Sequence, residues 1–397
     1  MNRPDPAVLA RRYTRFRVTE RVLLTGHSHQ AWPDCARDAQ LRAWDDAARH
    51  VDDKWDRAFA MAARVRAGYA ERLDDRDGDY TLSASTHDLL VRFLSALPLR
   101  ERPRLVTTDG EFHTVRRQLA RLAEAGVPVT VIPAEPVADL AARLAAAVDH
   151  RTAAVLVSCV LFRNARIVPG LGDLARRCTH HGAELLVDAY HAVNAVPVSL
   201  RDEGLERAWV VGGGYKYCQL GEGNAFLRVP PGCTLRPVVT GWFAEFGALA
   251  DAPGSGTVPY ADGPGRFAGA THDPVSQYRG AAVWDFFATE KLDVARLRDL
   301  GQHQLARLAT GFDALDLDPA LIARDRDVPL RDLGGFLVLD SPHASTFRAR
   351  LLERGVWTDH RDRALRLGPA PYVTDAQLEL AIAALGEIAG ELGRAAP

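Results

Sequence analysis

Lysine is scarce in this chain of 397 residues: only three of the 49 basic residues are lysines, and all the others are arginines. Where positive charge alone suffices, the chain therefore uses a guanidinium group, which stays protonated and cannot act as a nucleophile. Two of the lysines, Lys54 and Lys291, lie among charged residues, whereas Lys216 follows an apolar run and three glycines, between Tyr215 and Tyr217. An amine in such a place can lose its proton and condense with an aldehyde. The alternative is an ordinary lysine on a surface turn.

Long apolar runs, paired cysteines and an excess of one charge are also missing. No apolar stretch of about 18 residues is free of charge, and the charged N-terminus has no signal-peptide core, so we expect a cytoplasmic protein without a membrane span. The five cysteines are scattered and form no CxxC pair, which favours reduced thiols. The net charge of −2 gives no reason to expect a nucleic-acid or membrane partner. The histidines at 27–29 and 180–181 lack a partner motif, so no metal site is expected.

Short apolar segments alternate with amphipathic segments between about residue 80 and residue 230. Near-continuous apolar strands separated by helices predict a mostly parallel α/β sheet covered by helices on both faces. Ligands of such sheets bind beyond the carboxyl ends of the strands, where Asp188 and Lys216 fall. The predicted strands are at 104–107, 128–132, 153–158, 183–188, 208–211 and 225–228, and the predicted helices are at 114–125, 137–148 and 172–181.

The second half of the sequence predicts a long helix and a small α+β domain. Residues 247–270 are rich in glycine and proline and predict a long loop or linker. A helix is expected over 276–314, with a break near Asp293. In the C-terminal part we expect strands at 335–340 and 356–359, a helix at 345–355 and a final helix from Asp375.

The length of the chain predicts more than one domain. We expect an N-terminal segment at 1–45 that packs on the small domain, and a large α/β domain at 46–270. The connecting helix and the small domain are expected to occupy 271–397.

Lys216 and Asp188 together predict a site for pyridoxal 5'-phosphate (PLP). Lys216 can hold the aldehyde, and Asp188 can keep the pyridine nitrogen protonated, although it could instead cap a turn. His191 can hydrogen-bond that carboxylate or the phosphate, or it is merely structural. Ser85 and Thr86 precede an amphipathic run, so their hydroxyls and the first free N–H groups of a helix would face the phosphate. An ordinary helix cap explains the same two residues.

Two further residues would complete such a site. Tyr215 can donate a phenolic hydrogen bond to the phosphate. Arg366 lies at the end of a short predicted strand before a proline-rich turn, where a bidentate guanidinium suits the α-carboxylate of a substrate. Taken alone, Arg366 would more often be a surface arginine.

These motifs, in this order, resemble kynureninase and the class V aminotransferase superfamily of fold-type I PLP-dependent enzymes, over nearly the whole chain. LLTGHSHQAWP at 23–33 is similar to the family's L-D-G-N-S-L-G segment and retains Gly26 and Ser28. STHDLL at 85–90 resembles its phosphate loop. The DAYH stretch that begins at Asp188 resembles its D-x-x-H element, and the tyrosine–lysine pair at Lys216 resembles its Y-K pair.

Three motifs in the second half extend the resemblance. GWF at 241–243 is similar to the family's G-W-F, which implies that Trp242 lies near the cofactor phosphate, often across a dimer interface. GATHDP parallels a G-T-x-P segment and points to Thr271. RLGPAPY resembles the R-x-x-P-x-P-L-Y motif, whose arginine, here Arg366, binds the substrate carboxylate. The resemblance implies the fold-type I architecture with a sheet of the seven-stranded type, PLP as the cofactor, an amino acid as the substrate and a homodimer with shared active sites.

The sequence departs from the family pattern at several positions. The family's F-P-x-D element is replaced, so that Phe112, or alternatively His113, would stack on the pyridine ring, and Val115 stands where the family has aspartate. His27 replaces the asparagine of the N-terminal motif. With Ser28, it lies where the substrate side chain is expected.

The resemblance implies hydrolytic Cβ–Cγ cleavage of kynurenine, 3-hydroxykynurenine or a related β-acyl amino acid, as in tryptophan degradation. Lys216 would remove the α-proton and water would add to the γ-carbonyl, giving alanine and an aryl acid. The alternatives are aminotransfer, a specialised β-lyase reaction in secondary metabolism, or desulfurase-like C–S cleavage. A desulfurase needs a nucleophilic cysteine in the C-terminal half, whereas the last cysteine here is Cys233. A non-catalytic protein of this fold and a phosphate-binding enzyme without PLP are further alternatives.

Overall fold

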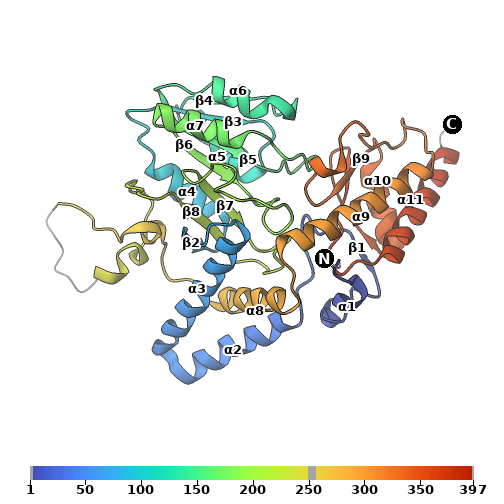
Figure 1. Cartoon of the computed structure of the whole chain (residues 1–397), viewed down its shortest axis with the longest axis horizontal. Coiled ribbons are helices and arrows are strands. Elements are labelled where there is room, and N and C mark those ends of the chain that lie inside the picture. Colours follow the sequence, from blue (N-terminus) through green and yellow to red (C-terminus); the bar gives the residue numbers. More distant parts are fainter. Residues whose placement is uncertain (1–2, 249–255, 396–397) are drawn as a thin grey trace.

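A seven-stranded sheet forms the centre of the larger part of the structure (Figure 1). The computed structural model describes residues 3–248 and 256–395. Neighbouring strands are parallel except for those next to β8, which is antiparallel to both β7 and β2. The predicted mostly parallel sheet is therefore confirmed. Across the sheet the strands are β2 (Asp79–Ser83), β8 (Ala225–Val229), β7 (Trp209–Gly213), β6 (Glu184–Asp188), β5 (Thr152–Ser158), β3 (Arg104–Thr108) and β4 (Val129–Ile132).

Helices cover both faces of this sheet, because its strands alternate their apolar side chains between two cores. Val155 and Val157 of β5 pack in one core with residues of α6 and α7, whereas Ala154 and Leu156 pack in the other with residues of α4 and α5. Full burial of each valine or leucine side chain contributes about 1.5–3 kcal/mol. The helices are α4 (Thr86–Ala96), α5 (His113–Glu124), α6 (Leu140–Ala146) and α7 (Leu171–His181).

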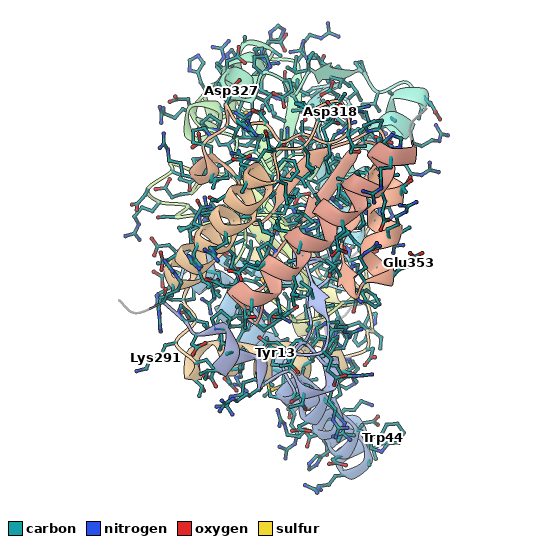
Figure 2. All side chains as sticks on the ribbon, turned by 90° about the vertical axis from the view of Figure 1, so that its right-hand side faces the viewer. Tyr13, Trp44, Lys291, Asp318, Asp327 and Glu353 are labelled. Carbon is teal, nitrogen blue, oxygen red and sulfur yellow. The ribbon has the colours of Figure 1, made fainter. Side chains whose placement is uncertain are left out.

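Two helices that the sequence pattern did not predict precede the sheet. They are α2 (Cys35–His50) and α3 (Lys54–Arg72), and both pack against α8 (Val275–Thr289), as Figure 1 shows. Their contact is made by small side chains, including Ala39 and Ala58. The outer end of α2 extends away from the rest of the chain, and Figure 2 shows Trp44 there, with 76% of the side chain exposed.

The predicted long helix is divided into two at the expected place. After α8 ends at Thr289, α9 (Val294–Ala314) begins, and Asp293 is its N-cap. The Asp293 carboxylate accepts a hydrogen bond from the backbone N–H of Arg296 at 2.8 Å. This cap satisfies a backbone donor that a helix start leaves free, and so fixes the break.

The smaller part contains a three-stranded antiparallel sheet, in the order β11-β12-β9. The predicted strand at 356–359 is in fact two, because β10 (Val356–Trp357) leaves this sheet and pairs in parallel with β1 (Val22–Leu23). That pairing joins the N-terminal segment to the smaller part. The other elements are β9 (Leu337–Asp340), α10 (Ala344–Glu353), β11 (Asp359–Arg361), β12 (Ala364–Leu367) and α11 (Asp375–Ala395).

The predicted glycine- and proline-rich loop lies partly outside the described residues, because 249–255 are not among them. Of the described remainder, residues 247–248 end the 3₁₀ helix Trp242–Ala248, and Gly263–Phe267 form a second 3₁₀ helix. None of the helices in the described ranges is both long and apolar enough to cross a membrane.

Candidate functional site

Asp188 lies at the carboxyl end of β6, in the middle of the sheet. In the strand register it is opposite Ser158 at the end of β5 and Val211 of β7. The backbone N–H of Ala189 continues the pairing and donates to the carbonyl oxygen of Val211 at 2.8 Å. The Asp188 side chain therefore leaves the sheet at the edge where the parallel strands end.

The loops after β2 and β7 leave the sheet at the same edge. Ser83, Ala225 and Gly213 form one row across β2, β8 and β7. Because β2 and β7 are both antiparallel to β8, their carboxyl ends lie on the same side. The segments that carry Ser85 and Lys216 thus begin at the same edge of the sheet, with β8 between them.

The glycines before Lys216 allow neighbouring side chains to approach the backbone. A Cβ atom at Gly213 would lie 2.4 Å from the hydroxyl oxygen of Tyr190, and a Cβ atom at Gly214 would lie 2.7 Å from the Cβ atom of Leu220. Larger residues would therefore push Tyr190 and Leu220 away. After the turn, the N–H of Gln219 donates to the carbonyl oxygen of Lys216 at 3.0 Å.

The amine of Lys216 is buried among aromatic rings. The residue is 5% exposed, and Nζ lies 2.7 Å from Nε2 of His191. The ring centroids of Tyr190 and Phe112 are 4.8 and 5.3 Å from Nζ. Burial lowers the pKa of Lys216 to about 7, although the carboxylate of Asp188 opposes this shift. The interpretation as a surface lysine is wrong, and much of the amine is neutral near pH 7.

Asp188 and His191 both interact with this amine, Asp188 through its charge and His191 through a direct contact. The Asp188 carboxylate accepts a hydrogen bond from the backbone N–H of Tyr190 at 2.9 Å, so it does cap a turn. Burial raises the pKa of Asp188, while this hydrogen bond and Lys216 lower it. His191 is 5% exposed, and burial moves its pKa well below the ordinary value. In the described part of the chain its Nδ1 has no hydrogen-bond partner.

Arg366 is a buried residue, and its interpretation as a surface arginine is wrong. It is 3% exposed on β12 and lies directly opposite Asp359 of β11. Its Nε donates to Oδ1 of Asp359 at 2.8 Å, and its Nη2 donates to Oδ2 at 2.5 Å. Its Nη1 donates to the carbonyl oxygen of Phe162 at 2.7 Å. The arginine predicted for a substrate carboxylate is thus already paired within the chain.

Sequence reasoning missed Asp359. It also placed His27 where the substrate side chain is expected, whereas the structure buries His27 against Asp359 and Phe336. His27 is 0% exposed, its Nε2 lies 2.8 Å from Oδ1 of Asp359, and its ring packs 4.5 Å from that of Phe336. Burial lowers the pKa of His27 to about 4. Burial would raise the pKa of Asp359, but hydrogen bonds from His27 and Arg366 outweigh it and hold the pKa below its ordinary value. The neutral imidazole therefore donates to an ionised carboxylate.

The segment that follows His27 contacts Tyr215. The hydroxyl of Ser28 lies 3.2 Å from Nδ1 of His29, and the His29 ring stacks on the Tyr215 ring with centroids 4.9 Å apart. Burial raises the pKa of Tyr215, as does the charge of Asp188, so its hydroxyl stays protonated and can donate.

Of the two aromatic candidates next to β3, the structure brings only Phe112 to the amine. Phe112 precedes α5 and packs edge-to-face on Phe162, with centroids 5.4 Å apart. His113 is exposed, and its hydrogen-bonding contact is with Arg116 rather than Lys216. Val115 is 3% exposed in the core, which explains why no polar side chain stands there.

Ser85 and Thr86 open helix α4 as the sequence suggested. The hydroxyl of Ser85 accepts a hydrogen bond from the backbone N–H of Asp88 at 3.3 Å, so Ser85 is the N-cap. Thr86 is the first helical residue. The helix is 11 residues long, and it begins at the sheet edge from which the loop of Lys216 also leaves. This arrangement suits an anion and equally an ordinary cap.

Glu111 is a second buried acid that sequence reasoning missed. It is 1% exposed and accepts hydrogen bonds from the hydroxyls of Thr108 at 2.7 Å and Ser158 at 2.6 Å. Burial raises the pKa of Glu111 to about 7, against the effect of these two hydrogen bonds. Glu111 ties the ends of β3 and β5 together and precedes Phe112, so it fixes the position of that ring. The only signal in the sequence is an acid placed directly before the aromatic residue.

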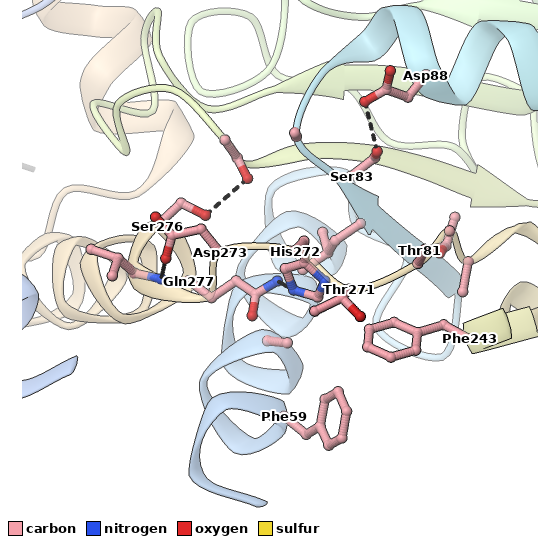
Figure 3. A pocket seen from close by; sticks show the side chains of 18 of the residues that line it. Phe59, Thr81, Ser83, Asp88, Phe243, Thr271, His272, Asp273, Ser276 and Gln277 are labelled. Atoms are coloured by element: carbon pink, nitrogen blue, oxygen red, sulfur yellow. Dashed lines mark hydrogen bonds between the residues drawn. The ribbon is translucent and has the colours of Figure 1, made fainter. Parts of the chain in front are cut away.

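Trp242 and Thr271 lie apart from this cluster. The indole N–H of Trp242 donates to the hydroxyl of Thr271 at 3.2 Å. Within the described residues, neither one hydrogen-bonds or stacks with Lys216, Asp188 or His191. Thr271 instead lines a cavity of about 930 Å³, in which Figure 3 shows Phe59 and Phe243 beside it. The structure thus does not bring these two predicted residues to the Lys216 amine of the same chain.

Comparison with known proteins matches a kynureninase over part of the chain and an aminotransferase over most of it. No protein-family model matches the chain. The kynureninase of Xanthomonas campestris pv. campestris (strain B100) is 30% identical over 180 residues, which are 42% of this chain and 41% of that enzyme. The match thus spans less than half of that relative. The uncharacterized aminotransferase YcbU of Bacillus subtilis (strain 168) is 21% identical over 351 residues, or 86% of this chain and 88% of YcbU.

Solved structures agree with the chain over nearly its whole length. A mutant of C-DES with glycine covalently linked to the PLP cofactor has a TM-score of 0.81 at 16% identity, covering 95% of this chain and 98% of that one. The apo cysteine desulfurase from Thermococcus onnurineus NA1 has a TM-score of 0.80 at 15% identity, covering 98% and 99%. These likenesses confirm the predicted fold, that of fold-type I PLP-dependent transferases.

Proposed function

We propose that this chain is a PLP-dependent enzyme that acts on an amino acid. The observation that carries the proposal is the buried Lys216 amine, with a pKa of about 7, at the sheet edge where the Asp188 carboxylate also lies. A buried neutral amine next to a partly paired carboxylate suits an aldehyde cofactor with a basic ring nitrogen. The partnerless Nδ1 of His191 gives a further polar atom for such a group. The residues present therefore fit PLP.

Each part of the cofactor has a residue that would hold it. Lys216 would bind the aldehyde, Asp188 would keep the ring nitrogen protonated, and Phe112 would lie on the ring. The phosphate would lie at the start of α4, with donors from the Ser85–Thr86 turn and from the Tyr215 hydroxyl. When bound, PLP supplies an electron sink that stabilises negative charge at Cα of the amino acid.

The chain's own residues supply the proton transfers. With a pKa near 7, the Lys216 amine can accept a proton from Cα of the substrate and return it at neutral pH. His191, whose Nε2 is 2.7 Å from that amine, orients it through a hydrogen bond. Tyr215 stays protonated and serves as a donor. Arg366 would orient the substrate by binding the α-carboxylate of the substrate.

The reaction that we propose is hydrolytic Cβ–Cγ cleavage of an aryl β-acyl amino acid such as kynurenine. Water adds to the γ-carbonyl carbon, the Cβ–Cγ bond breaks with its electron pair left on Cβ, and Cβ takes up a proton. The products are alanine and an aryl acid. Two features support this reaction: the identity shared with a kynureninase over 180 residues, and the aromatic wall of Phe112 and Phe162 next to Arg366.

Aminotransfer is the second candidate, because the match with YcbU extends over 86% of the chain. Desulfuration by a thiolate of the chain has less support. Burial raises the pKa of every cysteine thiol, to about 11 for Cys35, so none is a ready nucleophile at neutral pH. The cysteines are Cys35 and Cys233, which are partly buried, and Cys159, Cys178 and Cys218, which are fully buried.

We also propose that the active unit is a homodimer. Trp242 and Phe246 are each 45% exposed and pack on Phe243, beside the cavity that Thr271 lines. An exposed aromatic group of this kind is typical of a protein interface. In such a dimer, Trp242 and Thr271 would serve the phosphate of the second subunit.

The test of the reaction is a product assay with the PLP-loaded protein. Kynurenine and 3-hydroxykynurenine are supplied, and the aryl acid is followed by fluorescence while alanine is quantified separately. Equal amounts of alanine and aryl acid support C–C hydrolysis. Conversion of the bound cofactor to its amine form, with a keto acid as product, would support aminotransfer instead. If neither occurs, both proposed reactions are wrong.

A further inference from the structure

Arg366, the residue proposed to bind the substrate's α-carboxylate, already holds a carboxylate of its own chain. Asp359 and Arg366 are directly opposite in the pair β11–β12, and two N–H groups of the guanidinium donate to the two oxygens of Asp359. This is the bidentate geometry by which arginine recognises carboxylates in general. A ligand that approaches Arg366 therefore meets an ion pair whose net charge is zero.

Few donors of Arg366 remain for a ligand. A guanidinium carries five N–H donors. Asp359 uses two of them, and the carbonyl oxygen of Phe162 uses one on Nη1. Two remain, one on Nη1 and one on Nη2, the nitrogen that also binds Oδ2 of Asp359. A second carboxylate would thus gain fewer hydrogen bonds than at an open arginine, and it would be repelled by the first.

The Asp359 carboxylate is also fixed from its other sides. The Nε2–H of His27 donates to Oδ1 over 2.8 Å, and the His27 ring is fully buried against Phe336. Nη1 of Arg361 lies 3.6 Å from Oδ2. A rotation of the Asp359 side chain that freed Arg366 would break the hydrogen bond of a buried imidazole, which costs free energy.

The pair lies in the same site as the Lys216 amine. The Arg366 guanidinium is 5.5 Å from the centroid of the Phe336 ring, and that ring packs 5.7 Å from the ring of His191, which contacts the amine. Burial is the main cause that lowers the pKa of Lys216, and the charge of Asp188 opposes it. The positive charge of Arg366 lowers this pKa further and the negative charge of Asp359 raises it. Both members of the pair are thus close enough to influence the amine and a ligand bound next to it.

We propose that Asp359 is a specificity-determining residue that keeps the affinity of this site for a bare α-carboxylate low. Small amino acids such as glycine and alanine, which offer little beyond that group, are then bound weakly. An aryl amino acid compensates through contacts of its side chain with the aromatic wall of Phe112 and Phe162. This inference rests on the proposed function, in which alanine is a product and must leave the site.

The test compares the unmodified protein with Asp359→Asn. Asparagine has the same shape and can still accept from His27, but it removes the negative charge and one of the two acceptors for Arg366. The dissociation constants of glycine and L-alanine are measured on the PLP-loaded protein from the change in cofactor absorbance. We expect both amino acids to bind about tenfold more tightly, or better, to Asp359→Asn, as expected where a charge-assisted hydrogen bond is gained. Unchanged or weaker binding would overturn the proposal, because Asp359 would then only position Arg366.

A matched control lies in the same three-stranded sheet. Asp340 pairs with Arg363 in the same bidentate manner, but both are 57% exposed. Asp340→Asn should leave the affinity for glycine and alanine unchanged. An equal tightening in Asp340→Asn would show that surface charge, not the Arg366 pair, sets the affinity, and would overturn the proposal.

Two further measurements keep the test decisive. Calorimetric titration with propionate, which has a carboxylate but no amine, reports on Arg366 even if the protein takes up no PLP. Tighter binding of propionate to Asp359→Asn supports the role of Asp359 independently of the proposed function. If Asp359→Asn does not fold, the unmodified protein is titrated with L-alanine and L-alaninamide. The amide should bind at least as tightly, and a preference for the acid of about tenfold or more would overturn the proposal.

Discussion

The cluster around Lys216, which comprises Lys216, Asp188, His191, Arg366 and Asp359, differs from the exposed face around Trp242. The difference lies in whether residues of the same chain cover and pair the side chains. In the cluster, Lys216 contacts His191 and Arg366 pairs with Asp359, while Nδ1 of His191 has no partner among the described residues. Around Trp242, aromatic rings pack on one another, yet the indole is 45% exposed and Thr271 lines a cavity of about 930 Å³. The polar contacts of the cluster all lie within a single chain. The face around Trp242 leaves aromatic side chains exposed to solvent, and we propose that a second copy of the chain covers them in a homodimer.

The largest expected effect is the loss of the Lys216 amine. In Lys216→Ala, the visible absorbance of lysine-bound PLP should be absent, and the turnover number should fall by about 10³-fold or more, since a proton-transfer group is removed. Lys291→Ala is the control, because Lys291 is exposed outside the cluster. Turnover that survives in Lys216→Ala would assign the proton transfer to another residue.

The next largest effect is expected at Asp188. Asp188→Asn keeps the shape but removes the negative charge that would hold the ring nitrogen protonated. We expect a fall in turnover of about 10²–10³-fold, with PLP still bound. Glu184→Gln, at the other end of the same strand, is the control, because Glu184 hydrogen-bonds Trp209 away from the cluster. Equal losses in both variants would indicate damage to the sheet instead of a charge effect.

A smaller effect is expected on the exposed face. Truncating an aromatic residue at the centre of an interface weakens association by about 30-fold or more, so Trp242→Ala should shift a dimer toward monomers. Analytical ultracentrifugation over a range of concentrations measures this shift. Trp357→Ala is the control, since Trp357 is also exposed, at 40%, but lies in the smaller part of the structure. A monomer already present before mutation would contradict the proposed dimer.

The smallest effect concerns pH. Burial lowers the pKa of Lys216 to about 7, and only the neutral amine attacks an aldehyde. The rate at which PLP is taken up should therefore rise from about pH 6 to about pH 8 and then level off, whereas an ordinary lysine would keep rising about tenfold per pH unit. A lysine peptide measured in parallel supplies that reference. A rate without a plateau would show that the pKa of Lys216 is not lowered.

Six of the seven strands of the sheet could be predicted because they are largely apolar and the helices between them are amphipathic. The edge strand β2 was missed, because its sequence, DYTLS, is mostly polar. The pair α2–α3 was missed too, since Ala39 and Ala58 make its contact with α8, and small side chains give a weak periodic signal. The division at residues 45 and 270 stays a prediction.

The candidate site was predictable where function depends on residues close in sequence, as in the Asp188–His191 and Tyr215–Lys216 motifs. Asp359 was not, because its role comes from strand pairing: one residue, Thr358, separates β10 from β11 and places Asp359 opposite Arg366. Glu111 was missed because its partners lie on β3 and β5. The roles proposed for all these residues stay predictions until variants are measured.

The most direct test of the central claim is an absorbance spectrum of the protein after incubation with PLP and removal of the unbound cofactor. The account predicts the visible band of a lysine-bound cofactor in the unmodified protein and in Lys291→Ala, and its absence in Lys216→Ala. Absence of this band from the unmodified protein, or its presence in Lys216→Ala, would contradict the claim that Lys216 is the residue that binds PLP.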